Sequence, residues 1–131
     1  MNINTSIKDG RAVIAVTEDA VHKDYAEILP ALEKAGQLDE VAFDLKQMYY
    51  IMSSQIAELL GVKKWAAKGN IPVALLNVNP GVYQVLEMTN LLNLFIIRQD
   101  YSCYSLDELM DMFNSPENAD AVSAYLSSPY T

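Results

Sequence analysis

Two adjacent serines, Ser53 and Ser54, are the residues of this sequence whose type and position suggest chemistry. They stand just before a segment whose apolar residues recur at the spacing of a helix face, namely Ile56, Leu59, Leu60 and Ala67. A serine at such a boundary is a preferred N-cap, because its hydroxyl accepts a hydrogen bond from an unpaired amide of the first turn. We therefore expect Ser53 or Ser54 to begin a helix as its cap.

Phosphorylation is the chemistry that this position favours. A phosphate on Ser53 would add about −1.5 to −2 charge. The amides and the dipole at a helix N-terminus stabilise an anion by about 0.3–1 kcal/mol at exposed positions. The domain would tolerate the modification, so a switch here would act on a docked partner through desolvation and like-charge repulsion. The alternative is that both serines only cap the helix.

Catalytic residues are scarce in the sequence. The single histidine, His22, and the single cysteine, Cys103, lie far apart. The sequence has no zinc-ligand spacing, no Gly-x-Ser-x-Gly elbow and no glycine-rich phosphate loop. We therefore expect no enzyme activity, no metal and no cofactor.

The composition is typical of one compact domain: 131 residues, of which 51% are hydrophobic. A formal net charge of −8 opposes binding to a phosphate backbone and argues against nucleic acid as a partner. No apolar segment approaches the roughly 20 residues that span a bilayer, and the N-terminus lacks the apolar run of a signal peptide. We expect a cytoplasmic protein that does not insert into membranes.

The predicted elements alternate after an opening hairpin at Lys8-Asp9-Gly10. Pro30 interrupts the first helix, so we expect a bend there or a late start. Asn79-Pro80 is typical of an N-cap followed by the first helical residue. The remaining expected elements are strands at 11–16, 41–45, 71–76 and 91–97, helices from 25 and 53, and a helix that a capping box begins at Ser105. This alternation predicts a mainly parallel sheet.

The same residues resemble the STAS domain family, whose members include bacterial anti-sigma factor antagonists. The resemblance is carried by residues 41–61, VAFDLKQMYYIMSSQIAELLG, and residues 77–97, NVNPGVYQVLEMTNLLNLFII, and it extends over roughly residues 5 to 114. It implies a single α/β domain at 1–114 with a mixed, mostly parallel sheet of about five strands covered by helices on one side. We expect residues 115–131 to form an extension with a short helix and a frayed tail.

The family's motif is Asp-Ser-Ser/Thr-Gly, and here it reads Met52-Ser53-Ser54-Gln55. In the antagonists the first serine is phosphorylated by a partner kinase, so the resemblance implies phosphorylation of Ser53, with Ser54 as second choice. The implied function is a bacterial signalling protein that regulates transcription. The implied partner is an anti-sigma factor or a related serine kinase. Methionine and glutamine replace the aspartate and the glycine of the motif.

The family holds its partner with this loop and the helix that follows. The residues that the resemblance and the helical wheel place at the interface are Glu18, Asp19, Met52, Ser53, Ser54, Gln55, Glu58, Val62 and Trp65. We expect Val62 and Trp65 to face outward as apolar anchors, although Trp65 packed under a neighbouring helix is equally open. Met52 is either a partner contact or a core residue, and Tyr50 matches an apolar family position that predicts core packing.

Other functions remain open from the sequence. The chain could be a STAS accessory subunit of a phospholipid-transporting ABC complex, which would dock on the ATPase without phosphorylation. It could also be a sensor that binds a small ligand or nucleotide in a pocket above the strand ends. The oligomeric state is not predicted.

Overall fold

A computed structural model describes residues 2–98 and Asp107. The strands are β1 (Ile3–Lys8), β2 (Arg11–Val16), β3 (Glu40–Asp44), β4 (Val73–Leu76) and β5 (Ile96–Arg98). The helices are α1 (His22–Tyr25), α2 (Ile28–Lys34), α3 (Ser53–Lys68) and α4 (Pro80–Met88), with a 3-10 turn, η1, at Leu92–Leu94. The helix predicted at Ser105 and the extension predicted at 115–131 lie outside the described residues.

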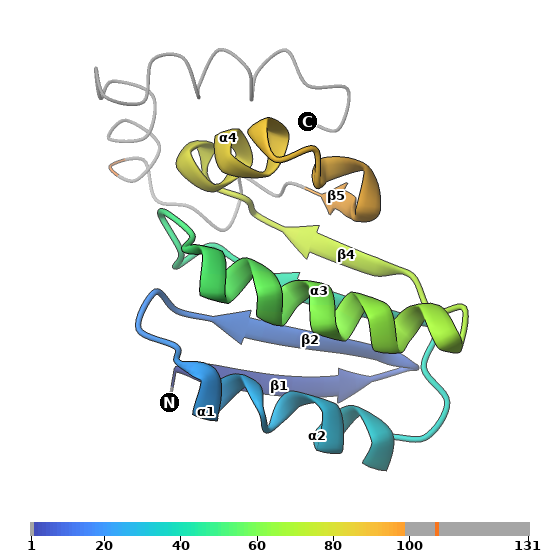
Figure 1. Ribbon diagram of the computed structural model, residues 1–131. Helices are drawn as coiled ribbons and strands as arrows, with labels where there is room; N and C mark the ends of the chain where they lie inside the picture. The colour runs from blue at the N-terminus through green and yellow to red at the C-terminus, as the bar shows by residue number, and fades with distance from the viewer. Residues whose placement is uncertain (1, 99–106, 108–131) are drawn as a thin grey trace.

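The strands form a single sheet in the order β1-β2-β3-β4-β5 (Figure 1). Strand β1 pairs with β2 in the antiparallel sense, and the remaining neighbours are parallel. Helices α1, α2 and α3 lie in front of the sheet in Figure 1. The predicted α/β fold, with a mixed sheet covered by helices on one side, is confirmed.

The hairpin between β1 and β2 follows from local chemistry. Asp9 and Gly10 both adopt left-handed backbone angles, with φ of 53° and 80°. Two such residues in a two-residue loop match the twist of the flanking strands, and Asp-Gly is a preferred pair for this geometry. The hairpin predicted at Lys8-Asp9-Gly10 is therefore confirmed.

Pro30 determines where the second helical segment begins. Helix α1 ends at Tyr25 and α2 starts at Ile28, so Pro30 falls in the first turn of α2. The missing amide of proline has no intrahelical acceptor there and is tolerated. Of the two predicted outcomes, a bend or a late start, the late start holds for α2, whereas the helical turn α1 begins before the predicted start at residue 25.

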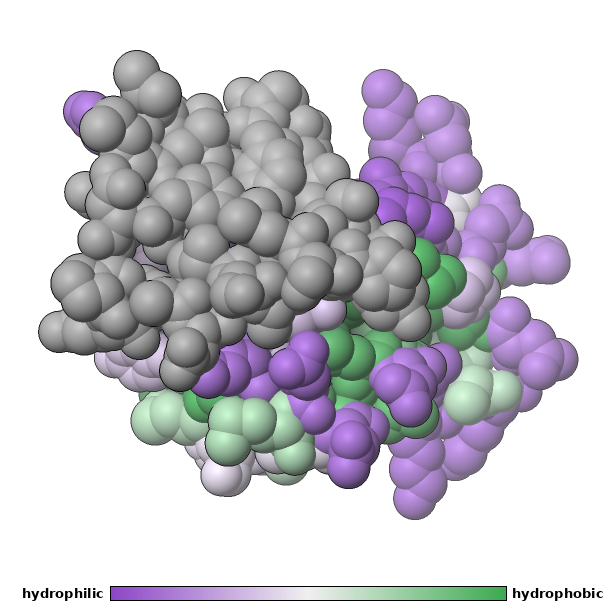
Figure 2. Space-filling view, turned by 90° about the horizontal axis from the view of Figure 1, so that it is seen from above, coloured by the Kyte–Doolittle hydropathy of each residue, from purple (hydrophilic) through white to green (hydrophobic). Residues whose placement is uncertain are grey.

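The core lies between the helices and the sheet. Strand β2 buries alternate residues, Ala12, Ile14 and Val16, whereas Val41, Ala42 and Phe43 of β3 are all buried. This contrast is expected because β2 lies next to the antiparallel edge strand β1, whereas β3 is the central strand and pairs in parallel on both sides. In the view of Figure 2, hydrophilic side chains stand out over much of the described surface, with hydrophobic ones showing between them.

The last strand is shorter than predicted. The apolar run at 91–97 was expected to be a strand, but its first half forms η1 and only Ile96–Arg98 pairs with β4. Asn90 has a left-handed φ of 59° and ends the preceding helix, after which Leu92 and Phe95 turn into the core. A short apolar run does not distinguish a buried turn from a strand by periodicity.

Candidate functional site

The start of α3 places both serines at the surface. Ser53 and Ser54 are the first two residues of the helix and are exposed, while Met52 occupies the N-cap position. The side chain of Met52 makes no capping hydrogen bond. The backbone amide of Met52 instead donates to Oε1 of Gln55 at 2.9 Å. The prediction that a serine is the N-cap is wrong, because Gln55, three residues on, reaches back to the N-cap amide.

Gln55 also connects α3 to the loop after β2. Its Nε2 donates to the carbonyl oxygen of Glu18 at 3.1 Å, and the Glu18 carboxylate accepts the Tyr49 amide at 2.7 Å. Gln55 is only 3% exposed. The residue was expected at a partner interface, but its side chain is buried and its role is internal.

Several large apolar side chains are exposed on the two segments that lead into α1 and α3. We call them the apolar collar: Val21, Tyr49, Tyr50 and Met52, which are 59%, 56%, 60% and 53% exposed. Tyr49, Tyr50 and Met52 belong to the loop that leads into α3, and Val21 precedes α1, which contacts α3. The core position expected for Tyr50 is wrong, and Met52 does not enter the core. A cluster of exposed apolar residues marks an interaction surface more often than scattered single ones do.

The buried face of α3 differs from the predicted one. Its buried residues are Gln55, Leu59, Val62 and Ala66. Val62 is 4% exposed, so the expectation that it faces outward is wrong, and Trp65 is partly buried against the core. Because α3 carries apolar residues on several sides, the helical wheel alone does not predict which row of residues packs against the sheet. Tertiary packing selected the stripe that contains Gln55.

Glu58 and the acidic loop residues remain accessible. The exposed ring of His22 lies with its Nδ1 at 2.5 Å from Oε1 of Glu58, which joins α1 to α3. Asp19 is exposed, and Glu18 is partly exposed despite its contact with Tyr49. Glu18, Asp19 and Glu58 therefore place carboxylates around the beginning of α3.

Tyr25 lies below this surface. Its hydroxyl is buried and has no hydrogen-bond partner among the described residues. Burial, and then the negative charges of Glu58 and Asp24, raise the pKa of Tyr25 to about 12. The phenol is therefore neutral at physiological pH.

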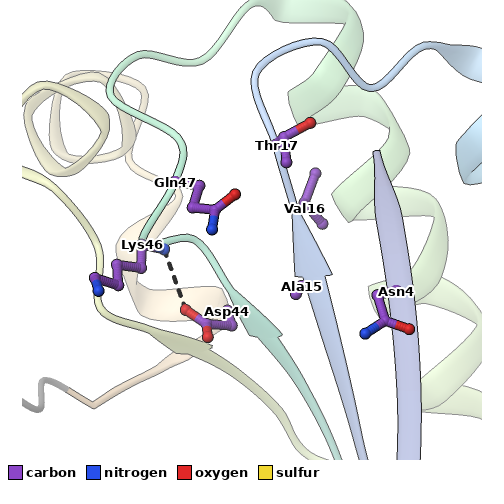
Figure 3. Close-up of a pocket in the computed structure, with 7 residues that line it drawn as sticks. All are labelled: Asn4, Ala15, Val16, Thr17, Asp44, Lys46 and Gln47. Carbon is purple, nitrogen blue, oxygen red and sulfur yellow. Dashed lines mark hydrogen bonds between the residues drawn. The ribbon is translucent and has the colours of Figure 1, made fainter. Parts of the chain in front are cut away.

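A hollow of about 260 Å³ lies at the carboxyl ends of β2 and β3. Figure 3 shows Asn4 and Asp44 on either side of Ala15, with Gln47 and Thr17 nearer the loops. One carboxylate oxygen of Asp44 already accepts the Lys46 amide at 3.1 Å. The hollow is smaller than the roughly 300–1,000 Å³ of typical small-molecule pockets. If the chain were a ligand sensor, we would expect its ligand to bind in this hollow.

The described residues show neither a metal-binding cluster nor a helix that could span a membrane. No group of three or more His, Cys, Asp or Glu side chains there is arranged to hold a metal ion. None of the helices in that part of the chain has the length and apolar character to cross a membrane.

Comparison with known proteins agrees with the fold. The STAS domain model matches residues 2–119, and the chain therefore belongs to the STAS domain family. No curated protein sequence matches it.

Solved structures with the same fold include anti-sigma factor antagonists. The anti-sigma factor antagonist SpoIIAA in its unphosphorylated form is 17% identical, with a TM-score of 0.61, covering 83% of this chain and 93% of that one. The phosphorylated form of the Bacillus cell fate determinant SpoIIAA is 16% identical, with a TM-score of 0.59, covering 83% and 96%. A variant of RsbS from Moorella thermoacetica is 15% identical, with a TM-score of 0.63, covering 87% and 97%. At these identities the likeness shows the fold alone.

Proposed function

We propose that this chain is a regulatory protein-binding module of the anti-sigma factor antagonist kind, without enzymatic activity of its own. It binds an anti-sigma factor or a related serine kinase through the Ser53 loop and the beginning of α3. Phosphorylation of Ser53 by that partner is its switch. The observation that carries the proposal is the exposure of Ser53 and Ser54 at a helix N-terminus beside the apolar collar.

The chemistry of this surface suits a protein partner. Tyr49 and Tyr50 offer rigid aromatic area that would leave water on docking, and tyrosine is enriched among the residues that dominate binding energy. The carboxylates of Asp19 and Glu58 form a polar rim that favours a partner surface with basic residues. A phosphate added at Ser53 would bring charge next to apolar contacts and weaken the complex by desolvation and by repulsion from these carboxylates.

The alternative of an ABC-transporter accessory subunit draws support from Met52. Its exposed side chain adds an apolar contact where the family motif has an acid. Such a subunit would use the same collar but would not need modification of Ser53.

A pull-down from native cell lysate tests the proposal. The purified full chain is the bait, beside a Tyr49→Ser/Tyr50→Ser double variant and a Met88→Ser control, since Met88 is 74% exposed on α4. We expect a serine kinase or anti-sigma factor on the wild-type and control baits, and its loss from the collar variant. Capture of transporter subunits would instead favour the accessory-subunit function.

The captured kinase then tests the switch. Incubation with ATP should add one phosphate to the wild-type chain and none to Ser53→Ala, as measured by intact mass. An unmodified wild-type chain, or equal modification of Ser53→Ala, would remove Ser53 from the proposed mechanism.

A further inference from the structure

Two surface loops that meet at the start of α3 are joined through Glu18 and Gln55. The Glu18 carboxylate accepts the amide of Tyr49 at 2.7 Å, and the Glu18 carbonyl accepts Nε2 of Gln55 at 3.1 Å. The other end of the same Gln55 amide accepts the Met52 amide at 2.9 Å. The carboxamide of Gln55 thus uses both its donor and its acceptor to connect the loop after β2 with the loop before α3.

Burial makes the two contacts of the Gln55 carboxamide hard to exchange for water, whereas the bond from the Tyr49 amide to the Glu18 carboxylate is exposed. Gln55 is 3% exposed, and it belongs to the face of α3 that packs on the core with Leu59 and Val62. A buried amide that loses its partners is left unsatisfied, which costs more than an exposed hydrogen bond contributes. The two loops are therefore attached to the rest of the domain by Gln55, whose buried carboxamide cannot replace its partners with water.

The residues tied in this way carry the proposed docking surface. Tyr49 and Met52, whose amides are held, are members of the apolar collar, and Ser53 follows Met52 directly. Ordering a loop at the moment of binding reduces affinity, so a loop that is already ordered binds more tightly for the same contacts.

We infer that Glu18 and Gln55 are positioning residues that hold the collar and Ser53 in their docking conformation before any partner or phosphate is present. The inference rests on the proposed function for what docks there. The clamp that these residues form is a property of the free chain and can be measured alone. Gln55 acts from beneath the surface and does not touch the partner.

Matched variants remove the hydrogen bonds of the clamp separately. Gln55→Ala removes the contacts to Met52 and to the Glu18 carbonyl. Glu18→Ala removes only the contact to the Tyr49 amide, whereas Glu18→Gln keeps an acceptor oxygen for that amide. Glu33→Ala is the control, because Glu33 is exposed on α2, away from the docking surface, and its carboxylate makes no hydrogen bond within the described residues.

Amide hydrogen exchange of the free full-length protein, resolved by NMR, is the test. Gln55→Ala should speed exchange of the Met52 amide by about tenfold or more, the size expected for loss of one part-buried hydrogen bond. It should also speed exchange of the Tyr49 amide, because the backbone of its acceptor residue, Glu18, is no longer held by Gln55. Glu18→Ala should affect Tyr49 alone, and Glu18→Gln and Glu33→Ala should behave as wild type. The Val41 amide, which donates to the Pro72 carbonyl at 3.0 Å in the sheet, reports global unfolding and should not change.

Several results would overturn the inference. Unchanged exchange at Tyr49 and Met52 in Gln55→Ala would show that the loops are held otherwise. An equal increase in the exchange rate of the Val41 amide would show that Gln55 only stabilises the fold as a whole. Once a partner is in hand, Gln55→Ala should also slow association several-fold, because fewer molecules present the docking conformation. Faster amide exchange without any change in association would show that the clamp does not position the docking surface, and would leave the proposed function itself intact.

Discussion

The side chain of Asn79 holds the loop that follows β3 by donating from Nδ2 to the carbonyl oxygens of Met48 at 2.8 Å and Lys46 at 2.9 Å. Asn79 is 2% exposed and stands at the N-cap position of α4, but no side-chain cap bond forms there. The residue expected to cap a helix instead joins α4 to the chain segment that leads to the candidate site.

Replacing Asn79 should therefore destabilise the domain. Asn79→Asp has nearly the same shape but removes the amide donors and turns a carboxylate toward carbonyl oxygens. We expect a loss of about 1–3 kcal/mol or more in the free energy of unfolding, measured by urea denaturation. Asn93→Asp, at an exposed position in η1, is the control and should change little. Equal stability of the two variants would contradict this role for Asn79.

Gly81 and Gly61 form a second matched pair. A Cβ at Gly81 would lie 2.7 Å from the carbonyl oxygen of Tyr49, whereas a Cβ at Gly61 meets nothing within 4 Å. Gly81→Ala should lower stability by about 1–3 kcal/mol because the site loop must move. Gly61→Ala should raise it by about 0.4–1 kcal/mol through helix propensity and the unfolded-state entropy. Thermal or urea denaturation that ranked the two variants the other way would show that the loop and α4 do not make this close approach.

Val62 distinguishes core packing from partner contact. Because Val62 is buried, Val62→Ala should cost roughly 1–3 kcal/mol of stability by leaving a cavity. The folded variant should still bind the partner as the wild type does. Denaturation and binding are measured on the same preparation. A Val62→Ala protein of unchanged stability but weakened binding would restore the outward-facing role predicted from the helical wheel.

Tyr25 predicts a pH dependence at the alkaline end. Its pKa is raised from 10.0 to about 12 in the folded chain, mainly by burial. A raised pKa means that the unfolded state loses its proton first, so the stability contributed by the neutral phenol is complete below pH 10 and falls as the pH rises toward 12. The fall amounts to about 2–3 kcal/mol for this group.

Tyr25→Phe removes that contribution and also removes a buried hydroxyl without a partner among the described residues. We expect it to be as stable as the wild type or more so near neutral pH, and to lose less stability between pH 10 and 12. Urea midpoints at several pH values measure both. Parallel curves for the two proteins would contradict a raised pKa at Tyr25.

The elements fixed by short-range chemistry could be predicted from the sequence. Asp9-Gly10 defines its turn by its own backbone preferences, and Pro30 defines where a helix can begin. The mostly parallel sheet follows from the alternation of strand and helix patterns. None of these features needs a partner from a distant part of the chain.

The interior of the candidate site could not be predicted in the same way. Gln55 and Glu18 are polar residues that were assigned to the surface, and only the contact between them, across 37 positions of the sequence, makes Gln55 an internal residue. Val62 was placed outward because α3 has apolar residues on several sides. Ser53 and Ser54 were correctly placed at the helix start, but the cap they were expected to provide comes from Gln55.

The central claim is that the apolar collar beside Ser53 is a protein-docking surface, and the affinity of the captured partner for collar variants tests it most directly. Isothermal titration of that partner into Tyr50→Ser should show binding at least about tenfold weaker than wild type, because an exposed aromatic anchor is lost. Met88→Ser should bind as the wild type does, and both variants should keep the wild-type melting temperature. Equal affinity of Tyr50→Ser and wild type, or weakening by Met88→Ser instead, would place the docking surface elsewhere and contradict the account.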